Sequence, residues 1–147
     1  MRSRSRLSRS PKRHFADPSL ATAALHARPD HLMKDIPWFG LLFESMVVRD
    51  LRVYAQAMGG RVFHYRDNTG LEVDAVVDIG PGRWAAFEVK LGQGRIDDAA
   101  AALLRFANRV DTDRSGQPAA LAVITGDGHG YQCPDGVGVI PVGALGP

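Results

Sequence analysis

The chain has 147 residues, of which 45% are hydrophobic and 23% are charged, and these values are ordinary for a globular protein with one buried core. It contains no run of 18 apolar residues, which excludes a membrane span, and its basic start lacks the apolar stretch of a secretory signal. The single cysteine excludes an internal disulfide and fits a reducing compartment, so we expect a cytoplasmic protein.

Charge is unevenly distributed along the chain. The first 13 residues carry six basic and no acidic side chains, whereas the remaining residues carry 12 basic and 16 acidic ones. Such a basic end either contacts a phosphate backbone or is simply solvated and disordered. We predict a disordered basic tail over residues 1–12 and a single folded domain over residues 13–147.

The first elements expected are short. Residues 12–16 are predicted to form a strand. Asp17 has the character of a helix cap and Pro18 suits the first helical position, which together predict a helix over residues 20–27. Residues 28–37 read as a loop.

Residues 38–58 give the strongest helical pattern. Large apolar side chains recur there every three or four residues, which is the period of a helix face packed on a core. These side chains are Phe43, Val47, Leu51, Tyr54 and Met58. The glycine pair that follows is a typical helix stop.

Three β-rich segments come next, over residues 61–65, 71–79 and 83–91, and they are separated by short turns rich in glycine, proline, aspartate and asparagine. This arrangement predicts an antiparallel meander. Residues 97–110 then show an amphipathic helical pattern with alanine-rich and leucine faces.

The continuous apolar run over residues 119–125 predicts a strand covered on both faces, and residues 137–142 predict a last strand. A crossover helix before a strand makes that strand parallel to its neighbour. We therefore predict an α/β fold with a mixed central sheet, flanked by the helices over residues 38–58 and 97–110.

Three carboxylates and one lysine carry most of the functional information. Because strand side chains alternate faces, Glu88 and Lys90 share one face, while Asp74 lies opposite both Val73 and Ala75. A tight turn between the strands brings Asp74 and Glu88 close enough to share a cation. Two carboxylates with water form the oxygen-rich shell that Mg²⁺ prefers, and Mn²⁺ is the alternative ion.

The chemistry of such a site is hydrolysis of a phosphodiester, because a bound metal polarises the phosphate and activates a water molecule. Lys90 would orient the water or offset charge on the phosphate. Glu44 lies among apolar helical neighbours, where a carboxylate is costly unless it is paired. It is predicted to assist as a third metal ligand.

Each residue also has an ordinary explanation. Glu88 and Lys90 could form an ion pair on an exposed strand, Asp74 could pair with an arginine, and Glu44 could pair with a residue of the tail. Taken together, their order and elements favour the nuclease-like site. Arg66 and Arg95 lie near the ends of the site strands and are candidates for nucleic-acid contacts, with surface solubility as the alternative.

Several motifs together resemble one family. They are Gly40-Leu41-Leu42-Phe43-Glu44, Val47-Val48-Arg49-Asp50-Leu51, Tyr65-Arg66-Asp67, Glu72-Val73-Asp74, Phe87-Glu88-Val89-Lys90 and the segment from Pro11 to Leu20. Over residues 11–126 the chain resembles the C-terminal part of the domain of unknown function 4143 family. This resemblance implies a restriction-endonuclease-like fold of the PD-(D/E)xK class, with Glu44, Asp74, Glu88 and Lys90 at the positions of that class's active-site set.

Members of the family usually follow an AAA-type ATPase module. This chain has no phosphate-binding loop, so it has no nucleotide site, and the winged-helix region is also missing. It resembles a truncated or stand-alone remnant. The first expectation is therefore a Mg²⁺-dependent phosphodiesterase that acts on DNA. The alternative is a non-catalytic binding or regulatory module that serves an ATPase partner in trans.

Overall fold

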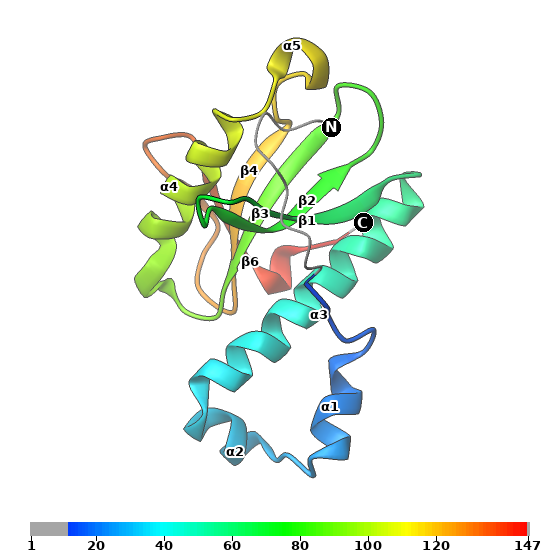
Figure 1. Cartoon of the computed structure of the whole chain (residues 1–147). Helices are drawn as coiled ribbons and strands as arrows, with labels where there is room; N and C mark the ends of the chain where they lie inside the picture. Colours follow the sequence, from blue (N-terminus) through cyan, green and yellow to red (C-terminus); the bar gives the residue numbers. More distant parts are fainter. Residues whose placement is uncertain (1–11, 147) are drawn as a thin grey trace.

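The computed structural model describes residues 12–146 and contains one mixed, six-stranded sheet in the order β1-β2-β3-β4-β6-β5 (Figure 1). The strands are β1 (Arg61–Arg66), β2 (Glu72–Asp78), β3 (Trp84–Lys90), β4 (Ala120–Thr125), β5 (Tyr131–Gln132) and β6 (Gly138–Pro141). The first three strands form the predicted antiparallel meander, and β4 is parallel to both β3 and β6. The α/β fold and the parallel crossover are thereby confirmed, whereas β5 was not predicted.

Five α-helices accompany the sheet in this part of the chain. They are α1 (Pro18–Ala24), α2 (Pro29–Lys34), α3 (Ile36–Ala57), α4 (Ile96–Ala107) and α5 (Thr112–Ser115). Single 3₁₀ turns precede α4 and follow β6, at Gln93–Arg95 and Val142–Ala144. None of the helices within residues 12–146 is both long and apolar enough to cross a membrane.

The N-terminal elements differ from the prediction in two respects. The expected strand over residues 12–16 is wrong, because these residues have no regular structure. The expected loop over residues 28–37 is also wrong, because Pro29 occupies the first turn of α2. The cap on α1 is confirmed, since Asp17 accepts a hydrogen bond from the Ser19 N–H at 2.9 Å. Of the predicted tail, only Lys12 lies within the described residues.

Helix α3 covers one face of the meander. Phe43, Val47 and Leu51 pack there with Ala75 and Ile124 of the sheet. The predicted apolar stripe is shorter than expected, because Tyr54 is only half-buried and Met58, which follows the last turn, is 56% exposed. The first half of α3 extends past the sheet together with α1 and α2 (Figure 1).

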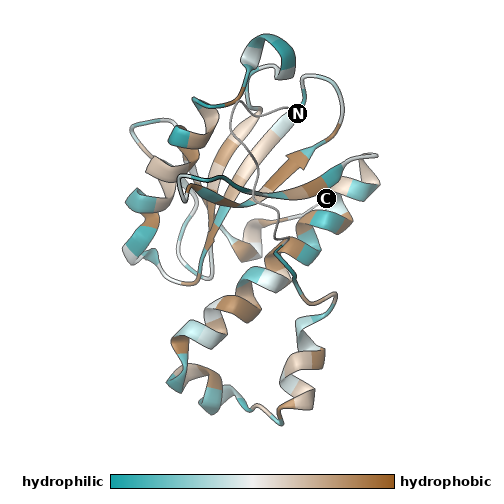
Figure 2. Ribbon diagram, viewed as in Figure 1, coloured by the Kyte–Doolittle hydropathy of each residue, from teal (hydrophilic) through white to brown (hydrophobic). Residues whose placement is uncertain are grey.

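Helix α4 covers the opposite face, and its Leu103 and Phe106 are fully buried. The Phe106 ring packs against Tyr65 and Trp84, with centroid distances of 4.6 and 5.9 Å. A helix packed on the sheet needs an apolar side for the sheet and a polar side for the solvent. Figure 2 shows the resulting alternation of polar and apolar residues along the helices. In β4, Val123 packs toward α4 and Ile124 toward α3, so the predicted two-sided burial of this strand is confirmed.

Strand β2 contains an extra residue near its start. Phe63 pairs with Val76 and Tyr65 with Val73, so two steps along β1 correspond to three along β2. Val73 therefore packs on the α4 side and Ala75 on the α3 side, and the expectation that they share a face is wrong. Bulges of this kind change the direction of a side chain locally, and Asp74 lies between these two residues.

Candidate functional site

The bulge places the Asp74 carboxylate between β2 and β3. The last regular pair between these strands is Ala75 with Phe87. Beyond it, Asp74 Oδ2 accepts a hydrogen bond from the Val89 N–H at 3.0 Å, so the side chain replaces a bond of the ladder. Asp74 is only 7% exposed, and the same oxygen lies 3.5 Å from Lys90 Nζ.

Glu88 and Lys90 lie on one face of β3, as predicted, and both line a cleft beside α4. Lys90 Nζ donates a hydrogen bond to Glu88 Oε2 at 2.6 Å. The Glu88–Lys90 ion pair, which was the alternative to a metal site, therefore exists. It does not lie on an exposed strand, however, because Glu88 is 6% exposed and β3 lies between β2 and β4.

The pKa values of the neighbouring carboxylates Glu88 and Asp74 are shifted in opposite directions. Burial and the negative charge of Asp74 raise the pKa of Glu88 to about 7. Burial alone would also raise the pKa of Asp74, but Lys90, Lys12 and the Val89 N–H more than offset that effect and hold this pKa below its usual range. Burial by itself lowers the pKa of Lys90, yet Asp74 and Glu88 raise it above its ordinary value. Lys90 is therefore cationic at neutral pH.

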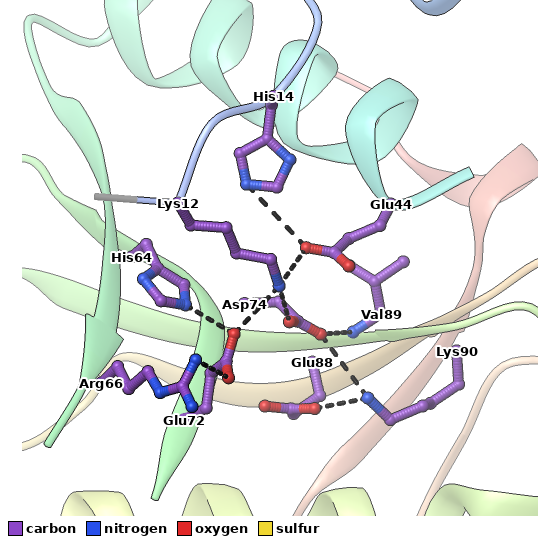
Figure 3. A network of polar contacts seen from close by, with 10 residues as sticks. All are labelled: Lys12, His14, Glu44, His64, Arg66, Glu72, Asp74, Glu88, Val89 and Lys90. Carbon is purple, nitrogen blue, oxygen red and sulfur yellow. Dashed lines mark hydrogen bonds and ion pairs between the residues drawn. The ribbon is translucent and has the colours of Figure 1, made fainter. Parts of the chain in front are cut away.

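A second lysine, which sequence reasoning missed, lies on the other side of Asp74. Lys12 Nζ is 2.6 Å from Glu44 Oε1, 3.0 Å from Asp74 Oδ1 and 3.1 Å from Glu72 Oε1 (Figure 3). Glu44 thus pairs with Lys12, at the end of the predicted tail, and not with Lys90. Pairing with a tail residue was the alternative to a metal-ligand role for Glu44. Burial, with Asp74 as a second cause, raises the pKa of Glu44.

Two histidines border this cluster. The His14 ring is almost wholly buried, and its Nε2 lies 3.8 Å from Glu44 Oε1 without a hydrogen-bond partner among the described residues. His64 Nε2 lies 2.8 Å from Glu72 Oε1. Arg66 Nη1 is 3.7 Å from the other oxygen of Glu72 and remains 57% exposed, so it stands at the border of the cluster (Figure 3).

The cleft that contains Glu88 and Lys90 has a volume of about 810 Å³. The turn after β1 and one side of α4 form its walls, and its charged lining combines five cations with four carboxylates. The cations are Lys12, Lys90, Arg95, Arg105 and Arg109, and the carboxylates are Glu72, Asp74, Glu88 and Asp98. Arg95, a predicted contact residue, belongs to this lining, whereas Arg66 does not.

The donor chemistry of the site fits Mg²⁺ or Mn²⁺ at one position. Asp74 and Glu88 offer hard oxygen ligands beside an open cleft, and Mg²⁺ is commonly held by one or two carboxylates with several waters. The third predicted ligand, Glu44, faces Lys12. Within residues 12–146, no group of three or more histidine, cysteine, aspartate or glutamate side chains has the arrangement of a metal-binding set.

The fold and the site together define an α/β domain with a buried carboxylate–lysine cluster that opens into a charged cleft. The chain belongs to the family described as domain of unknown function DUF4143, which matches residues 39–145. The resemblance seen in the sequence motifs is confirmed at the level of the family. No curated protein and no solved structure gives a significant match.

Proposed function

We propose that this chain is a Mg²⁺-dependent phosphodiesterase of the PD-(D/E)xK type that acts on DNA. The observation that carries the proposal is the convergence of Asp74, Glu88 and Lys90 in one cleft. Lys90 contacts both carboxylates, at 3.5 Å from Asp74 and 2.6 Å from Glu88. Buried carboxylates in contact with each other, with a cation between them, are typical of sites that bind a metal or move a proton.

The chemical roles follow from these positions. When bound, Mg²⁺ would polarise the phosphate and lower the pKa of an attacking water. Asp74 and Glu88 would hold the ion, since burial and the charge of Asp74 disfavour the ionised form of Glu88, and a bound cation would offset both effects. Lys90 would position the water or offset charge on the phosphate, and Glu44 would assist by its charge beside Asp74.

The arginines of the cleft support a nucleic acid as substrate. Arg105 is exposed on the side of α4 that lines the cleft, which we call the α4 wall, and Arg95 is exposed in the 3₁₀ turn just before this helix. The Arg109 side chain is fixed by Asp67 and Thr69. Cations in this arrangement favour a phosphate backbone, and contacts of this kind position a duplex without reading its sequence. The wall thus faces the proposed metal across a cleft that can take a polyanion.

Plasmid cleavage with Mg²⁺ or Mn²⁺ tests the proposal. Asp74→Asn and Lys90→Met should each lower the rate at least about 100-fold, because the first removes a charged metal ligand and the second removes a positive charge at the reacting phosphate. Asp113→Asn is the matched control, since Asp113 is exposed on α5 and lies outside the cleft. Equal cleavage by all four proteins, or none by the wild type with either ion, would contradict the proposal.

One observation favours the alternative, a non-catalytic binding or regulatory module that works with an AAA-type ATPase partner. Large apolar side chains are more than half exposed in the N-terminal helices and directly after α1, at Leu20, Leu25, Met33 and Leu41. Exposed apolar groups mark protein–protein contacts where they form one contiguous patch. Cleavage that is absent alone and also absent when an ATPase of the family is added would favour this module.

A further inference from the structure

Lys12 occupies a position that resembles that of a bound cation. Its ammonium group lies within 3.1 Å of three carboxylates, one from α3 and two from β2, and its side chain is 25% exposed. An ammonium has three N–H donors, and here three different carboxylates surround it. Glu44, Glu72 and Asp74 together form an oxygen-rich shell of the composition that a divalent cation would also use.

A second observation points to the same position. The His14 side chain is 4% exposed, and its Nε2 is directed at Glu44 Oε1 without a hydrogen bond to any described residue (Figure 3). Buried polar atoms are nearly always hydrogen-bonded. A free ring nitrogen aimed at the shell therefore indicates that the shell can take a ligand other than the lysine.

Asp74 separates this shell from the proposed metal site. Its Oδ1 faces Lys12, while its Oδ2 faces Lys90 and the Val89 N–H. Two cation positions therefore lie on the two sides of one carboxylate, and the ammonium groups of Lys12 and Lys90 lie at them. Glu88, whose hydrogen bond goes to Lys90, belongs to the second side.

We propose that Lys12 permanently takes one of two cation positions at Asp74, so that the site binds a single divalent ion on the Glu88 side. This proposal rests on the proposed function. Lys12 is then a positioning residue that fixes the number of metal ions. Its single positive charge would partly offset the charges of Glu44, Glu72 and Asp74, and would leave Asp74 Oδ2 and Glu88 to the metal.

The test is Mn²⁺ titration calorimetry on the full chain, with the melting temperature measured on the same samples. The wild type is expected to bind about one Mn²⁺, and Lys12→Met about two, because the neutral methionine leaves the three-carboxylate shell without its cation. Mn²⁺ should also raise the melting temperature of Lys12→Met more than that of the wild type. Lys34→Met is the matched control, since Lys34 is exposed at the end of α2.

The outcomes separate the two proposals. One ion bound by both the wild type and Lys12→Met would overturn the role of Lys12 and leave the proposed function standing. No ion bound by the wild type but one bound by Lys12→Met would show that Lys12 fills a cation position, but it would overturn both the single ion on the Glu88 side and the proposed function. In the double variant Lys12→Met/Glu44→Gln the added ion should bind at least tenfold more weakly, and unchanged binding would place it outside the shell.

A measurement on the wild type covers the case in which Lys12→Met fails to fold. Acetylation by an amine reagent, followed by mass spectrometry, should label Lys12 at least tenfold more slowly than Lys34, with and without Mn²⁺. If Mn²⁺ accelerated labelling of Lys12 to the rate of Lys34, the metal would displace the lysine and the proposal would be wrong.

Discussion

Asp67, in the turn after β1, and Glu88, in β3, are both buried carboxylates, but their surroundings are opposite. Asp67 accepts hydrogen bonds from the Tyr65 hydroxyl, from the hydroxyl and N–H of Thr69, and from the Leu71 N–H, and it pairs with Arg109. Burial alone would raise its pKa, but these donors lower it to about 2.

Glu88 has one close donor, Lys90, and a second carboxylate beside it. Its pKa is raised to about 7, mainly by burial and then by Asp74. The comparison shows that burial by itself does not distinguish a carboxylate with structural contacts from one with the proposed functional role. The number of donors per negative charge does, because a carboxylate short of donors has capacity for a metal or a proton.

The largest effect expected from this comparison is on stability. Asp67→Asn should lower the free energy of unfolding by about 3 kcal/mol, since it leaves Arg109 and several donors around a neutral amide. Urea unfolding at pH 7 measures this loss. The exposed Asp113→Asn control should stay within about 0.5 kcal/mol of the wild type. A similarly small effect of Asp67→Asn would show that Asp67 does not stabilise the fold.

The contribution of Asp67 has a defined pH range. Its pKa in the folded protein is about 2, below its ordinary value of 3.8. The stabilisation is therefore fully present above about pH 4 and is lost as the pH falls toward 2. The difference between wild type and Asp67→Asn should shrink over that range, and a constant difference would contradict the assignment.

Glu88→Gln should have a smaller effect, and the opposite one. The folded-state pKa of about 7 lies above the ordinary 4.5, so the wild type loses stability as the pH rises between these values. Without metal, Glu88→Gln should therefore gain about 1–2 kcal/mol relative to the wild type between pH 4.5 and 8, less than the pKa shift alone implies because Lys90 loses its closest partner. Thermal unfolding across this range measures the gain. A stability difference between Glu88→Gln and the wild type that does not change with pH would contradict the raised pKa and assign Glu88 a structural role like that of Asp67.

The smallest effect concerns DNA binding. Arg105→Gln should weaken binding modestly and equally for all sequences, and should reduce the slope of log affinity against log salt by about 1, since one phosphate contact is lost. Arg66→Gln is the matched comparison, because Arg66 lies outside the cleft lining. Fluorescence anisotropy over a salt series measures both slopes, and equal slopes for the two variants would contradict a role for the α4 wall.

Local periodicity was sufficient to predict α3, the meander, α4 and β4, because each presents its apolar residues at the spacing of its own element. Alternation along β3 likewise predicted the shared face of Glu88 and Lys90. The bulge in β2 was not predictable, since one extra residue leaves the apolar character of a strand unchanged. Helix α2 was missed because Pro29 suggested a loop, although proline suits a first turn.

Lys12 was missed for a different reason. Its partners Glu72 and Asp74 lie 60 and 62 residues away, so no local pattern connects them. Its segment has no regular structure and follows a basic run. The one available signal was the position of Glu44 among apolar helical neighbours, where a carboxylate requires a partner. This signal correctly suggested a residue of the tail.

The most direct test of the central claim is a carbon-13 NMR titration of the side-chain carboxyls, with and without Mg²⁺. Glu88 and Asp67 can be assigned from Glu88→Gln and Asp67→Asn. We expect Glu88 to titrate near pH 7 without metal and at a clearly lower pH with Mg²⁺, while Asp67 titrates near 2 in both cases. A Glu88 titration near 4.5, or one that Mg²⁺ does not move, would contradict the account.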